Sequence, residues 1–129
     1  MRTMRRSVWL FVLLGAAGCA TAAVERAAQP LATGGQAVSI EVIRFTFLPD
    51  VVTLKAGEPI TITAVSKSGI PHNITILSLE GQVLKDVDIG RKRTEVFQVT
   101  LPAPGRYVFY CANFLHRRPF GMEGALVAT

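Results

Sequence analysis

Apolar and polar residues alternate along most of the chain beyond residue 37, and this pattern favours an extended, sheet-forming backbone. Alternation places the apolar side chains of a strand on one face, where they can be buried. Turns that contain glycine or proline separate the alternating stretches. No stretch keeps the roughly 3.6-residue period of a helix for more than one turn. The pattern predicts an all-β protein, an antiparallel sandwich or barrel with short strands at residues 38–42, 43–47, 51–55, 60–64, 74–76, 96–101, 107–111 and 125–128.

Two stretches depart from simple alternation. The inward-facing phase changes between Val42 and Ile43, so we expect an extra residue there, in a bulge or a bend. Residues 85–93 are the most polar part of the body, and we expect a loop or one helical turn in that segment.

The first 18 residues have the pattern of an export signal. Arg2, Arg5 and Arg6 precede an apolar run at residues 8–14, and secretion machinery recognises a positive segment followed by a short apolar one. The run is too short to span a bilayer, which takes roughly 20 residues. Residues 16–19, Ala-Ala-Gly-Cys, resemble the lipobox of bacterial lipoproteins. That resemblance implies a lipid on Cys19, and ordinary cleavage after Ala22 is the alternative.

These features predict three segments. Residues 1–18 are a lipoprotein-type signal peptide, residues 19–36 are a flexible linker rich in small and polar residues, and residues 37–129 are one folded domain. We therefore expect an exported, periplasmic protein that is attached to a membrane only through its N-terminal lipid. Removing the three signal arginines lowers the formal net charge from +5 to +2, which does not support nucleic-acid binding.

Residues that bind soft metals are scarce in the predicted mature chain. His72 and His116 are its two histidines, Met122 is its one methionine, and Cys111 is the one cysteine in the predicted domain. A thiolate, two imidazoles and a weak thioether suit a copper ion that alternates between Cu(I) and Cu(II). Zinc, a disulfide between Cys19 and Cys111, and ordinary buried side chains are the alternatives.

Three segments resemble the cupredoxins, the small blue-copper family of plastocyanin- and azurin-like proteins. Gly69-Ile-Pro-His-Asn73 is similar to the family's segment around its first histidine ligand. Tyr110-Cys111, followed by His116 and Gly121-Met122-Glu-Gly124, resembles its Tyr-Cys…His…Gly-Met-x-Gly loop. Phe45-Thr-Phe-Leu-Pro49 is similar to the opening strands of many bacterial members.

The resemblance implies a Greek-key β-sandwich that binds one copper ion through His72, Cys111, His116 and Met122. It also implies that Asn73 forms hydrogen bonds that make the ligand loop rigid and tune the cysteine sulfur. Because the chain has no third histidine for an open catalytic metal position, we do not expect an enzyme.

The resemblance further implies a periplasmic carrier of single electrons between redox proteins, such as a cytochrome, an oxidase or a reductase. We expect a monomer. A copper-binding or delivery module without redox turnover is the alternative, and a metal-free structural lipoprotein is a third possibility. Arg117 and Arg118 would steer an acidic partner, while a second basic group at residues 91–93 receives no role. The expected docking residues around His116 are Ile70, Phe114, Leu115, Arg117, Arg118, Pro119 and Phe120.

Overall fold

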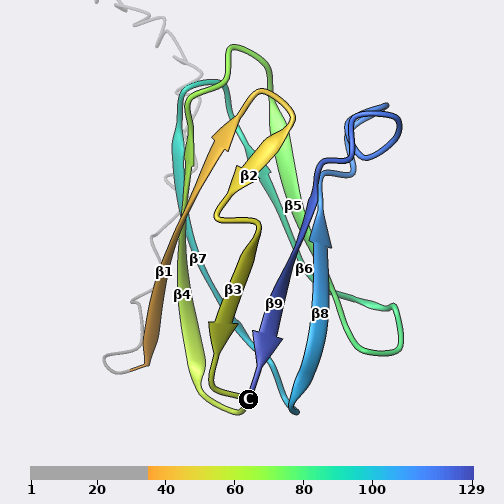
Figure 1. Cartoon of the computed structure of the whole chain (residues 1–129). Helices are drawn as coiled ribbons and strands as arrows, with labels where there is room; N and C mark the ends of the chain where they lie inside the picture. The colour runs from red at the N-terminus through yellow and green to blue at the C-terminus, as the bar shows by residue number, and fades with distance from the viewer. Residues whose placement is uncertain (1–34) are drawn as a thin grey trace, which may run out of the picture.

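Two β-sheets packed face to face form the part of the chain that the computed structural model describes, residues 35–129 (Figure 1). One sheet has the strand order β2-β1-β4-β7, from Thr46–Leu48, Gln36–Ile43, Pro59–Ser66 and Thr94–Thr100. The other has the order β3-β9-β8-β5-β6, from Val51–Leu54, Glu123–Ala128, Gly105–Tyr110, His72–Leu77 and Val83–Ile89. Residues 35–129 contain no helix that is long and apolar enough to cross a membrane.

The chain passes from one sheet to the other five times: between β2 and β3, β3 and β4, β4 and β5, β6 and β7, and β7 and β8. These crossings confirm the predicted Greek-key sandwich. Two pairs of strands differ from the antiparallel expectation, because β1 pairs with β4 and β3 pairs with β9 in parallel. Alternation has the same two-residue period in both kinds of pairing, so the sequence pattern alone does not distinguish them.

The start of the domain is a hairpin, and the expectation of an extra residue at Val42–Ile43, in a bulge or a bend, is wrong, because both residues pair regularly with the next strand. Ile43 lies opposite Thr46 in an antiparallel pair, which leaves Arg44 and Phe45 as a two-residue turn, with Arg44 at a φ of 52°. A positive φ is typical of such tight hairpin turns. The phase of the alternation changes because the chain reverses direction, not because a residue is inserted.

The polar segment 85–93 also differs from its prediction of a loop or helical turn. Most of it belongs to β6, and only residues 90–93 form the following turn. β6 is an edge strand, and Ile89 is its one buried residue. A strand at an edge buries little of its surface, which explains why its sequence is so polar.

The inner faces of the two sheets form a continuous apolar core. Ile60, Ile62 and Ala64 of β4 alternate with partly exposed residues and are completely buried. Ile74 and Ile76 of β5 are also completely buried. The predicted alternation therefore corresponds to the observed inward face.

Four connections lie at the end of the sandwich opposite the C-terminus: residues 44–45, 67–71, 90–93 and 112–121 (Figure 1). We call this the ligand end, because the predicted metal-binding residues lie in or beside these connections. Predictions for residues 1–34, including the signal peptide and the lipid on Cys19, fall outside the described residues. Of the predicted linker 19–36, the structure describes Gly35 and Gln36, and Gln36 is the first residue of β1.

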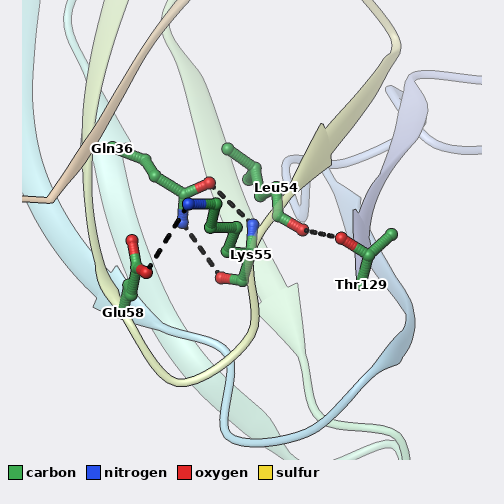
Figure 2. Close-up of polar contacts among 5 residues, drawn as sticks. All are labelled: Gln36, Leu54, Lys55, Glu58 and Thr129. Atoms are coloured by element: carbon green, nitrogen blue, oxygen red, sulfur yellow. Dashed lines mark hydrogen bonds and ion pairs between the residues drawn. The ribbon is translucent and has the colours of Figure 1, made fainter.

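Side-chain hydrogen bonds fix the opposite end, which we call the far end. Figure 2 shows the Gln36 amide, which accepts from the Lys55 backbone N–H at 2.6 Å and donates to the Lys55 carbonyl at 3.0 Å. The Thr129 hydroxyl donates to the Leu54 carbonyl at 3.2 Å. These bonds attach the start of β1 to Lys55, which follows β3, and the residue after β9 to the last residue of β3.

Tyr107 is a buried residue whose polar end is satisfied locally. Its hydroxyl donates to the Ala103 carbonyl at 2.8 Å and accepts from the Ala103 N–H at 3.1 Å. Both bonds hold the connection before β8 against the core, and a buried hydroxyl without partners would be costly.

We predict that Tyr107→Phe lowers the free energy of unfolding by about 1–2 kcal/mol, because it leaves the Ala103 N–H and carbonyl without their partner. The measurement is urea unfolding of the copper-free protein followed by circular dichroism. Tyr110→Phe is the matched control and should change stability by less than about 0.5 kcal/mol, since Tyr110 is only partly buried. Equal effects of the two variants would contradict the prediction.

Candidate metal centre

The structure brings His72, Cys111 and His116 together at the ligand end. Their ligand atoms all lie within 4.8 Å of one another. Cys111 Sγ is 3.3 Å from His116 Nδ1, and the two imidazole ring centroids are 4.9 Å apart. These separations are short enough for one metal ion to contact all three residues.

Strand pairing explains how distant residues converge. His72 begins β5, and β5 pairs with β8, whose last residue immediately precedes Cys111. The chain then leaves the sheet, passes through His116 and returns as β9. The sandwich thus provides one ligand position from a strand start and two from a neighbouring loop.

Backbone hydrogen bonds close this loop at its base. The Cys111 N–H donates to the Met122 carbonyl, and the Met122 N–H donates to the His116 carbonyl, both at 3.1 Å. Gly121 precedes Met122 at a φ of 67°, a conformation that glycine adopts without steric cost. The Met122 side chain is completely buried, and these backbone bonds hold the residue next to Cys111 and His116.

The His72 ring is polar and buried, yet it has no hydrogen-bond partner among the described residues. The side chain is 1% exposed. Burial, assisted by the nearby His116, lowers the pKa of His72 to about 4. The ring is therefore neutral at pH 7, with a free lone pair. A buried nitrogen without a partner costs roughly 1–3 kcal/mol, and a metal bond would remove that cost.

The Cys111 sulfur is completely buried. Burial raises the pKa of its thiol, the backbone N–H groups of Asn113 and Asn73 oppose this through hydrogen bonds to the sulfur, and the charge of Asp88 raises it further. A thiolate without a cation is thus unfavourable here. A metal ion held by Cys111 would take the place of the thiol proton and supply the missing positive charge.

Asn73 links β5 to the ligand loop through its side chain. Its side-chain oxygen accepts from the Ala112 N–H at 3.2 Å and from the Thr75 hydroxyl at 2.7 Å. Its amide nitrogen donates to Asp86. Because Ala112 directly follows Cys111, this network fixes the backbone at the sulfur, and the Asn73 N–H also reaches the sulfur itself.

Phe45, in the hairpin turn, contacts the centre in a way that the sequence analysis missed. Its ring meets that of His116 edge-on at 5.0 Å and that of His72 at 6.5 Å between centroids. It also stacks on Phe120 at 4.2 Å. The family-like segment 45–49 contained the residue, but nothing in the sequence indicated that the turn would reach the histidines.

The expected docking residues lie mostly at the surface. Phe114 is 87% exposed, whereas His116 and Arg117 are half-buried. Arg117 already makes two contacts within the domain. Its Nε donates to Glu123 at 3.0 Å, and its guanidinium lies over the Tyr110 ring at 4.1 Å. The remaining expected docking residues are all exposed: Ile70, Leu115, Arg118, Pro119 and Phe120.

The donor set fits copper better than the alternatives. Two imidazoles and a thiolate form a trigonal set, and a buried thioether alongside them is characteristic of type 1 copper rather than zinc. Among the described residues Cys111 is a free thiol. The cofactor that this site accommodates is one copper ion.

The sandwich and its buried cluster define a small copper-binding β-protein, and comparisons with known proteins identify its family. The family model of the cupredoxin-like domain matches residues 8–128. The chain therefore belongs to the cupredoxin-like family.

Its curated relatives include plastocyanins. The chloroplastic plastocyanin of Oryza sativa subsp. indica is 38% identical, over 85% of this chain and 77% of that protein. The plastocyanin of Dryopteris crassirhizoma is 33% identical, over 69% of this chain and 93% of that protein.

Solved structures share the fold. Auracyanin A, a "blue" copper protein of Chloroflexus aurantiacus, superposes with a TM-score of 0.66 at 19% identity, over 74% of this chain and all of that one. Amicyanin from Paracoccus versutus superposes with a TM-score of 0.54 at 22% identity, over 75% of this chain and 85% of that one.

We predict that Phe45→Ala lowers the free energy of unfolding of the copper-free protein by about 2 kcal/mol, since it removes a ring packed against three others. Phe114→Ala is the matched control, because it deletes the same atoms from an exposed position, and should cost less than about 0.5 kcal/mol. Urea unfolding measures both. A loss for Phe114→Ala as large as that for Phe45→Ala would refute the packing role of Phe45.

Proposed function

We propose that this protein is a type 1 copper protein that carries single electrons between redox partners, with His72, Cys111, His116 and Met122 as the copper ligands. The observation that carries the proposal is the meeting of the two histidines and the cysteine within 4.8 Å in a buried cluster. Membership of the cupredoxin-like family and similarity to proteins named plastocyanin support it.

The bound copper would supply the one-electron chemistry, and the protein would keep the ligands still. Asn73 holds the backbone after Cys111, and Phe45 packs on both imidazoles. Ligands that are fixed before and after electron transfer need little rearrangement, which keeps the barrier low. His116 is half-buried at the ligand end, and it is the least buried of the four proposed ligands.

The burial of the site favours a carrier over a copper-delivery module. Delivery requires donors that exchange readily, whereas His72 and Cys111 are 1% and 0% exposed. All the donors would be used by one ion, so no position is left for a substrate. This supports a protein without enzymatic activity of its own.

We also propose that residues 1–18 direct export, that Cys19 carries a lipid, and that residues 37–129 form the copper domain in the periplasm. The positive residues, apolar run and lipobox-like Ala-Ala-Gly-Cys in the N-terminal sequence support this location.

We predict that adding Cu(II) to the purified protein produces an intense blue or green colour from charge transfer between Cys111 sulfur and copper. Cys111→Ser should abolish the colour while circular dichroism shows the sandwich intact. Cys19→Ser, which removes the other cysteine, is the matched control and should keep the colour. A folded wild-type protein that stays colourless with Cu(II) would refute the proposed function.

We predict that Met122→Leu keeps the colour and raises the reduction potential, because loss of a weak axial donor destabilises Cu(II) more than Cu(I). The exchange nearly conserves volume, so the fold should tolerate it. Leu126→Met, a similar exchange at a buried position of β9, is the control and should leave the potential unchanged. If Met122→Leu also leaves the potential unchanged, Met122 is not a ligand. Cyclic voltammetry measures both variants.

A further inference from the structure

The charges of the domain are distributed very unevenly. The four connections of the ligand end contain seven of the ten arginines and lysines in residues 35–129 and none of the eight aspartates and glutamates. Two of these cations, Arg117 and Arg118, directly follow His116, but five come from other connections. The seven residues are Arg44, Lys67, Arg91, Lys92, Arg93, Arg117 and Arg118.

Most of these cations have no acidic partner. Within residues 35–129 the ion pairs are Arg117 with Glu123 and Lys55 with Glu58. Apart from Arg117, the cations of the ligand end are all exposed. Six positive charges therefore face solvent at one end without a neutralising carboxylate in ion-pair contact.

Hydrogen bonds to backbone carbonyls join the four connections into one preformed surface. The Lys67 N–H donates to the carbonyl of Val42, which lies in β1 two residues before the hairpin turn, at 2.9 Å, and the Lys92 N–H donates to the Ser68 carbonyl at 3.1 Å. The Asn113 side chain donates to the Pro71 carbonyl at 2.9 Å. These bonds fix the turns that carry the charges relative to the ligand loop.

Exposed apolar side chains lie at the same end as the cations. Phe114 is 87% exposed, Phe120 52% and Leu115 50%. Aromatic and aliphatic groups next to unpaired arginines are the composition of a protein-binding surface. Because His116 opens onto the same end, a partner bound there would lie beside the metal centre.

From this charge complementarity we propose that the ligand end docks a redox protein whose electron-exchange face is ringed by carboxylates. The proposal rests on the proposed electron-carrier function and adds the chemistry of the partner. Residues 91–93, which had no role in the sequence analysis, become part of the docking surface together with Lys67 and Arg44. The positive field would raise the rate of encounter with an acidic surface and weaken as salt is added.

The test first compares two small electron acceptors of opposite charge. The reduced protein gives one electron to hexacyanoferrate(III), forming hexacyanoferrate(II), or to tris(phenanthroline)cobalt(III), forming the cobalt(II) complex. Stopped-flow rates are measured on the Cys19→Ser protein, which cannot be lipidated. Between about 10 mM and about 300 mM salt, we expect the rate with the anion to fall several-fold and the rate with the cation to rise.

Two double variants distinguish the effect of the charges at the ligand end from the effect of the net charge of the protein on the electron-transfer rate. Lys67→Glu/Arg91→Glu reverses two exposed charges of the ligand end, neither within two residues of a proposed copper ligand. Lys55→Glu/Arg106→Glu makes the same change in net charge at the far end, where Figure 2 shows Lys55. We expect the first variant to lower the low-salt rate with hexacyanoferrate(III) several-fold and the second to leave it near the wild-type value. Equal effects of the two variants would overturn the proposal.

Binding is then measured without electron transfer. Poly-L-glutamate added to the copper-free protein should shift the NMR signals of residues 67–71, 90–93 and 112–121, and the Lys67→Glu/Arg91→Glu variant should weaken this binding. Stronger binding of the same surface to phosphatidylglycerol vesicles than to poly-L-glutamate would overturn the proposal in favour of a membrane.

The copper and surface proposals fail in different ways. If the protein does not become coloured or reduce either acceptor, the electron-carrier function is wrong. If it reduces both acceptors with a salt dependence that neither variant changes, the carrier function survives and the proposed docking surface is wrong.

Discussion

The metal centre depends on the backbone bonds that close the loop between β8 and β9. They hold Cys111 to Met122 and Met122 to His116, while β5 presents His72 from the neighbouring strand. Side chains alone would lose much conformational freedom on meeting in this arrangement. The sheet has already restricted their backbones, so little additional ordering is needed to bind a metal.

Residues that are not donors to the metal also restrict the conformations of the site. Asn73 connects the strand to the loop through Ala112, and Phe45 fills the space beside both imidazoles. Both act by limiting movement. The His72 nitrogens, by contrast, are buried and have no hydrogen-bond partner among the described residues. They therefore remain available to bind the ion.

The sequence predicted the sandwich and the donor cluster because both depend on strong local signals. Alternation identified β4 and its buried isoleucines, and the small number of histidines and cysteines left few possible donor sets. The hairpin at Arg44 was misinterpreted because a chain reversal and an inserted residue both change the phase of alternation. The contacts of Phe45 depend on how two connections meet in space, which alternation does not encode.

The first described strand begins at the end of the domain opposite the metal centre. Gln36 is held there by its paired hydrogen bonds to Lys55 (Figure 2). If the proposed lipid on Cys19 fixes the chain to a bilayer, the domain is suspended from its far end. Because the predicted linker is flexible, this attachment would leave the ligand end free to turn toward diffusing partners, which would not compete with the anchor for the same face.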